Sequence, residues 1–197
     1  MNSMWLYEIR RCGPSVLATP IAVAAAAGLV SPALGVDTTI QVIAGNTVAL
    51  VAGLAAAAAL GGEQMVELQL TVRTPYSLTV ARRLALVLAA TSCAVLLFSA
   101  LASSAANAWT GTLLVGNTAF ALALIGVATY MAAGHGSTAG ASTMVVTVWL
   151  GKLLVLDNFV RAVPTQAAVL LTVAAPCVWL AVQRLMDSET QMHGAGG

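Results

Sequence analysis

Charged side chains are scarce in this sequence. Only 8% of its 197 residues are Asp, Glu, Lys or Arg, whereas 59% are hydrophobic and the mean hydropathy is +0.92. A soluble domain of ordinary composition has about 25% charged residues, with which it covers its surface. The shortage excludes a soluble globular protein and predicts an integral membrane protein. The net charge of +1 provides no field to attract nucleic acid, so we expect no nucleic-acid partner.

Residues with catalytic or metal-binding chemistry are equally few. The three cysteines, Cys12, Cys93 and Cys177, are far apart in sequence, which indicates that they act as small buried hydrophobic residues. A disulfide bridge between two of them is the alternative. His135 and Ser137 lie in "GHGSTAG", which is typical of a turn between two helices. We therefore predict no metal site, no cofactor and no catalytic centre.

The sequence also lacks a phosphate-binding loop. The nearest string, "WLGKLL", has neither the first glycine nor the hydroxyl residue that the motif requires. The chain is therefore not expected to hydrolyse ATP by that mechanism.

Long apolar segments are abundant, and six of them reach the length of about 20 residues that a helix needs to cross a bilayer. The segments are Pro14–Leu34, Ile40–Leu60, Leu84–Ala102, Gly111–Ala133, Thr138–Leu156 and Val163–Gln183. We predict an all-α integral membrane protein with one transmembrane domain, residues 1–197, and a six-helix bundle, residues 14–183.

The arginines are distributed unevenly between the two faces of such a bundle. One face of the bundle holds both termini and the loops 61–83 and 134–137. The loops of the other face contain a single arginine, Arg161. The arginine-rich face carries Arg10, Arg11, Arg73, Arg82, Arg83 and Arg184. Because basic residues mark the cytoplasmic side, both termini, including the tail 184–197, are predicted to be cytoplasmic. The predicted location is the cell inner (cytoplasmic) membrane, crossed several times.

The first 13 residues predict a short helix of their own. Met4, Trp5, Ile9 and Cys12 fall near one helical face, and Gly13 then breaks the helix. This pattern favours an interfacial helix on the cytoplasmic leaflet, with a frayed anchor as the alternative. A cleaved signal peptide is a second alternative, but the apolar segment that follows is longer than a usual signal core.

Small residues recur at every fourth position of the second segment: Gly45, Ala49, Gly53, Ala57 and Gly61. Small side chains allow helices to approach closely in lipid. The ladder therefore predicts a packing face, either inside the bundle or between two subunits.

Asn46, Asn117 and Lys152 are polar residues within apolar segments that could line a pathway. An intramembrane charge is a functional candidate by default. However, Lys152 lies only about 6 Å along a helix from the end of its segment, so its side chain could instead extend to the outer interface. Both interpretations are open at this stage.

The loop 61–83 is far longer than a connection between two helices needs. Val66 to Arg73 alternate apolar and polar, which taken alone favours a strand. An isolated strand at a membrane surface would have unpaired edges, so we expect an amphipathic helix ending near Pro75. Arg82 and Arg83 lie at the cytoplasmic end of the third span, where we expect lipid phosphates to hold them.

The residues Glu63–Leu84, "EQMVELQLTVRTPYSLTVARRL", resemble the loop between the second and third spans of type-two ABC exporter permeases. The resemblance implies a coupling helix that docks on a separate ATPase, which would bind ATP and magnesium. On this basis the coupling residues are expected to be Glu63, Glu67, Arg73, Thr74, Pro75, Tyr76 and Ser77.

The resemblance implies the membrane subunit of an ATP-driven exporter, paired with a second permease chain, identical or different. Its partners would be ABC ATPase subunits, and the chain itself would not be an enzyme. Two alternatives remain: a substrate-binding membrane module of an energy-coupling transporter, and a non-transporting membrane scaffold.

Overall fold

The computed structural model describes residues 2–33, 38–61, 76–103, 110–135, 137–160 and 162–194, and all the regular structure in these ranges is helical. The elements are α1 (Asn2–Cys12), α2 (Pro14–Ala33), α3 (Thr38–Gly61), α5 (Tyr76–Ser103), α6 (Thr110–His135), α7 (Thr138–Gly151), the π-helical segment η1 (Lys152–Leu156), α8 (Asp157–Phe159) and α9 (Val163–Gly194). Helices suit a bilayer because each satisfies its own backbone hydrogen bonds.

Five of the helical stretches are long and apolar enough to cross a membrane. They are Ile40–Gly61, Leu78–Ala102, Leu114–Gly134, Thr138–Phe159 and Val163–Arg184, and α2 adds a shorter apolar stretch, Pro14–Val30. The chain is thus built as a multi-pass, all-helical membrane protein, as predicted. A sixth crossing by α2 stays a prediction.

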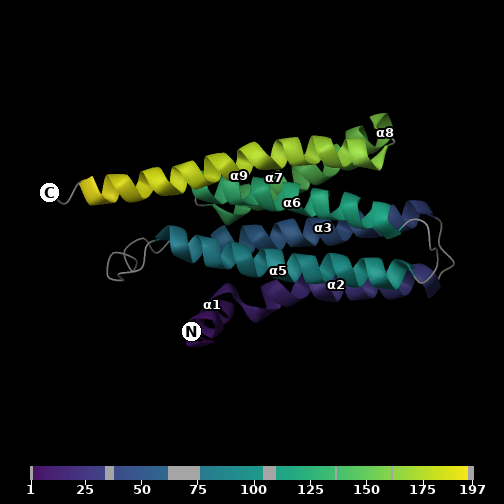
Figure 1. Ribbon diagram of the computed structural model, residues 1–197, viewed down its shortest axis with the longest axis horizontal. Helices are drawn as coiled ribbons and strands as arrows, with labels where there is room; N and C mark the ends of the chain where they lie inside the picture. Colours follow the sequence, from purple (N-terminus) through teal and green to yellow (C-terminus); the bar gives the residue numbers. More distant parts are fainter. Residues whose placement is uncertain are drawn as a thin grey trace.

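Helix α6 is the central element of the bundle. It packs against α3, α9, α7 and α5, while α2 packs against α5 and α3 on the far side (Figure 1). The core around α6 contains the fully buried Phe120 and Leu124, together with alanines of α3 such as Ala52 and Ala56. Alanine keeps α3 and α6 close together, and the large side chains of α6 fill the remaining space.

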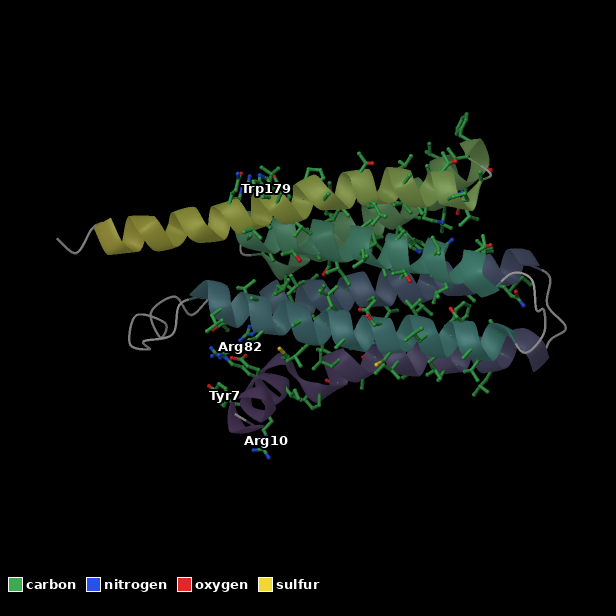
Figure 2. The ribbon with its side chains drawn as sticks, in the orientation of Figure 1. Tyr7, Arg10, Arg82 and Trp179 are labelled. Atoms are coloured by element: carbon green, nitrogen blue, oxygen red, sulfur yellow. The ribbon has the colours of Figure 1, made fainter. Side chains whose placement is uncertain are left out.

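The two ends of the bundle differ in what they hold. Helix α1, the last turn of α3, the first turn of α5 and the C-terminal end of α9 lie at one end, and α8 lies at the other (Figure 1). Along the sides, apolar residues such as Trp179 of α9, which is 66% exposed, point away from the bundle (Figure 2). Such side chains suit contact with lipid.

The small-residue ladder of α3 lies inside the chain, against α6 and α7. A Cβ atom at Gly45 would come within 2.4 Å of the Asn117 amide, and one at Gly61 within 2.8 Å of the Thr138 hydroxyl. Ala49 and Ala57 are fully buried. Of the two predicted packing roles, the described helices therefore use this face within the bundle.

Replacing Gly53 with alanine tests this close packing. A Cβ atom there would lie 2.8 Å from Cβ of Leu124 and 2.9 Å from Cγ1 of Val145. We expect Gly53→Ala to lower the free energy of unfolding by about 1 to 3 kcal/mol, the usual cost of overpacking. Denaturant titration of the purified protein in mild detergent measures it.

Gly151 is the matched control, since it is helical and a Cβ atom there would meet nothing within 4 Å. Gly151→Ala should leave stability unchanged or raise it by up to about 1 kcal/mol. Equal losses in the two variants would contradict the packing described for α3.

A buried polar cluster and a buried ion pair as candidate functional sites

Lys152 is turned into the bundle and is only 7% exposed. Its Nζ atom donates to Oδ1 of Asn46 at 2.9 Å and to Oδ1 and Oδ2 of Asp157 at 2.9 and 3.1 Å. The ammonium group also lies 4.9 Å from the centre of the Phe120 ring. Hydrogen bonds and the ring face together replace the water that this cation has lost.

This geometry depends on the π-helical turn η1. In an α-helix, residues five apart point about 140° away from each other, so Lys152 and Asp157 would face different neighbours. Here the backbone N–H of Asp157 bonds to the carbonyl of Lys152, a span of five residues. The wider turn brings the two side chains to one side of the helix. Such π-turns are frequent at functional sites.

Asn46 joins this turn to α3. Its backbone carbonyl accepts a hydrogen bond from Nε1 of Trp149 at 3.1 Å, and its Nδ2 approaches Oδ2 of Asp157 at 3.5 Å. The polar cluster of Asn46, Lys152 and Asp157 therefore cross-links α3 to the segment from α7 to α8. We call these three residues the polar cluster.

A cavity of about 40 Å³ adjoins the polar cluster between α3, α6, η1 and α9. It is lined by Val42, Asn46, Thr112, Gly116, Asn117, Lys152, Val163, Gln166 and Leu170. Asn117 is buried, and its Nδ2 atom has no hydrogen-bond partner among the described residues. The cavity has polar walls and room for a water molecule.

The polar cluster is not expected to add much to the stability of the fold. Lys152 and Asp157 neutralise each other, and a buried ion pair of this kind often gives no net stabilisation over apolar residues of equal volume. Charged residues inside a membrane are costly and mark functional positions. The polar cluster is therefore the leading candidate for a functional site within the bundle.

The structure shows what surrounds the polar residues singled out in the sequence. The ammonium group of Lys152 is buried and bonds to Asp157 and Asn46. Asn46 and Asn117 lie on one cavity with it, whereas the sequence alone did not align them. Asp157, Phe120 and Gln166 were not predicted as site residues; the acid five residues after Lys152 was the available signal for Asp157.

A second buried charged pair lies at the opposite end of the bundle. Glu8 of α1 and Arg83 of α5 are 5% and 4% exposed, with Nε of Arg83 3.5 Å from Oε2 of Glu8. Nη1 of Arg83 also donates to the carbonyl of Ala59 at 3.2 Å, in the last turn of α3. This pair joins α1, α3 and α5.

The expectation that lipid phosphates hold Arg83 is therefore wrong. The arginine is too deeply buried to meet lipid. A carboxylate of α1 and a carbonyl at the C-terminal end of α3 bind its guanidinium group inside the bundle instead. Arg82, its neighbour, is half-buried and makes no such contact with the described residues.

Most of the predicted coupling residues lie outside the described residues: Glu63, Glu67, Arg73, Thr74 and Pro75. Tyr76 and Ser77 form the first residues of α5. The predicted strand-or-helix choice for residues 66–73 likewise falls outside the described ranges. At the other predicted turn, Oγ of Ser137 accepts from the backbone N–H of Gly140 at 3.2 Å and caps α7.

Comparisons with models of known protein families, with curated proteins and with solved structures found no match.

Proposed function

We propose that the chain is the membrane subunit of an ATP-driven exporter of the type-two ABC kind. Two such chains, identical or different, line a pathway, and separate ATPase subunits dock on the loop 61–83 of each chain. The proposal combines the multi-pass helical bundle with the resemblance of Glu63–Leu84 to a coupling loop.

The buried Glu8–Arg83 pair is the observation that carries this proposal furthest. Helix α3 ends and α5 begins at the end of the bundle where α1 also lies (Figure 1). Arg83 ties the start of α5 both to α1 and to the last turn of α3. A force applied to the loop would therefore move three helices together, as a coupling device requires.

The cavity beside the polar cluster is small for a ligand site. Sites that enclose a small molecule are usually about 300 to 1,000 Å³. The cavity of about 40 Å³ is far smaller. A site of this size suits a closed gate better than a preformed ligand pocket. In the proposed exporter, the polar cluster closes the pathway at the end opposite to the coupling loop.

Charge reversal in the loop tests the coupling role. The variant Glu63→Lys/Glu67→Lys is expected to insert normally but to lose at least tenfold of the ATP-dependent transport by the reconstituted complex, because ion pairs with the ATPase would become repulsive. The assay uses proteoliposomes containing this chain and an ATPase subunit that co-purifies with it. Substitutions that disrupt Thr74–Ser77 should likewise lower ATP-dependent transport while leaving insertion intact.

The matched control is Arg184→Glu, a charge reversal at the same end of the bundle but on α9. It should leave coupled transport within about twofold of the unmodified chain, since surface charges remote from an interface contribute little. Equal transport by the loop variant and the unmodified chain would overturn the coupling role, and a scaffold would then be the better assignment.

A further inference from the structure

Asn117 on α6 is a buried amide whose side chain lies against α3. It is 6% exposed, and a Cβ atom at Gly45 would come within 2.4 Å of its Nδ2 atom. Glycine at position 45 therefore leaves the space that the amide occupies. The Nδ2 atom donates no hydrogen bond to any residue that the structure describes. A buried donor without an acceptor costs free energy, so it indicates a partner other than the side chains around it.

Gln166 on α9 provides the complementary group on the same cavity. Its Nε2 atom donates to the carbonyl of Val160, which fixes the orientation of the amide. The Oε1 atom is then left as an acceptor, and no residue in the described part of the chain donates a hydrogen bond to it. Both amides line the cavity of about 40 Å³ beside Lys152. One unused donor and one unused acceptor therefore share a single small space.

These two groups determine which kind of ligand suits the cavity. A water molecule can accept from the Asn117 amide and donate to Oε1 of Gln166, whereas an anion cannot donate and a metal cation cannot accept. The charge of Lys152 is already balanced by Asp157, so the cavity has no excess positive charge to hold an anion. The cavity of about 40 Å³ also exceeds the roughly 10 to 15 Å³ that one water molecule needs.

The cavity lies close to the end of the bundle where α8 lies. Thr112, the third residue of α6, is exposed, and Val163 is the first residue of α9; both line the cavity. The starts of α6 and α9 lie at the α8 end in Figure 1. Water therefore needs no route through the middle of the bundle to enter the cavity.

We propose that this cavity is a water-binding site, with a water molecule held between Nδ2 of Asn117 and Oε1 of Gln166. The bound water joins α6 to α9 through two hydrogen bonds and lies beside the ammonium group of Lys152. In the proposed exporter it would hydrate that group when Lys152 and Asp157 separate, which lowers the cost of opening the polar cluster. Only this last step rests on the proposed function; the water site itself requires only the fold.

Hydroxyl-radical labelling of the purified full chain by a brief X-ray exposure tests the proposal. The radicals form from water molecules where they stand, so they modify side chains that touch bound water even inside a protein. Leu170 lines the cavity, whereas Leu124 is fully buried in the core around α6. Leu170 is expected to be modified roughly ten times faster than Leu124, because only Leu170 has water beside it. Equal rates at the two leucines would show a dry cavity and overturn the proposal.

The variants Asn117→Leu and Gln166→Leu each remove one partner of the water, and each should lower the rate at Leu170 to that of Leu124. Asn158→Leu is the matched control, because it removes an exposed amide that does not line the cavity. It should leave the rate at Leu170 unchanged. An unchanged rate in folded forms of both test variants would contradict the site, and the comparison within the unmodified chain decides the matter if neither variant folds.

A chloride titration distinguishes water from an anion. The labelling is repeated in a buffer without chloride and after chloride is added. The rate at Leu170 is expected to stay the same, because the cavity binds a neutral molecule. A rate that falls as chloride is added would assign the cavity to an anion and would also overturn the proposal.

Discussion

Lys152→Ala is expected to lower the free energy of unfolding by about 2 to 4 kcal/mol. Removing one partner of a fully buried ion pair leaves the other charge without compensation at a cost of about 3 to 5 kcal/mol. The smaller loss expected here reflects Asp157, whose side chain is 24% exposed. Here Asp157 would lose two short contacts, and the side chain of Asn46 would lose its donor. Denaturant titration in mild detergent, followed by tryptophan fluorescence, measures the change.

The double variant Lys152→Met/Asp157→Leu separates loss of charge from loss of packing. Because both charges are absent, most of the stability should return. The difference between the double variant and the sum of its two single variants, Lys152→Met and Asp157→Leu, gives the coupling of the pair, expected to exceed about 1 kcal/mol. Additive losses would show that Lys152 and Asp157 do not interact in the folded protein.

In a working exporter the same double variant should behave differently. If the polar cluster closes the pathway, apolar residues would restore folding but not the reversible opening of an ion pair. We expect stability close to that of the unmodified chain and transport reduced at least tenfold. Full transport by a stable double variant would assign the polar cluster a structural role.

Arg83→Ala is expected to be the other severe change, with a loss of about 3 to 5 kcal/mol. It would leave the carboxylate of Glu8 buried and take the donor from the Ala59 carbonyl. In addition, α1 should detach from the bundle. Thermal unfolding measures the first effect, and protease cleavage within residues 2–12 measures the second.

Glu8→Gln is the informative comparison for this site. Glutamine keeps a hydrogen-bond acceptor for Arg83 and removes only the charge, so a smaller loss of about 1 to 2 kcal/mol is expected. If Arg83→Ala cost no more than Glu8→Gln, the contact with the Ala59 carbonyl would add nothing to the joint between α1, α3 and α5.

Much of the fold could be predicted from the sequence, because in lipid an apolar run of sufficient length satisfies its backbone only as a helix. The apolar segments fall on the observed helices, although α5 begins at Tyr76 instead of Leu84 and α9 continues to Gly194 instead of Gln183. The break at Gly13 separates α1 from α2. The side of the helix that packs was also visible, since the four-residue ladder of α3 is the face buried against α6 and α7.

The candidate site could be predicted only in part. Lys152 and Asp157 were visible as charges, but their five-residue spacing places them on different faces of an α-helix. Only the π-turn brings the two side chains together, and no local sequence pattern predicts that turn. Asn46 and Asn117 come together through the packing of α3 on α6. Such a contact between distant segments cannot be predicted from either segment alone.

The role of Arg83 was missed for a related reason. A basic residue at the start of a span normally points to phosphate groups, and an acid in an interfacial helix normally points to water. Their burial together depends on the angle at which α1 returns over the bundle after Gly13. That angle is a property of the tertiary structure.

The most direct test of the account is a photo-crosslink from the loop 61–83 to an ATPase. A photoreactive amino acid is placed at Leu68 of the loop, and at Leu154 as the control, which is exposed near α8 at the opposite end. Irradiation of the complex with its co-expressed ATPase should yield a crosslinked product from position 68 and none from position 154. An intact complex in which position 68 gives no crosslink, or in which only position 154 does, would contradict the coupling role of the loop.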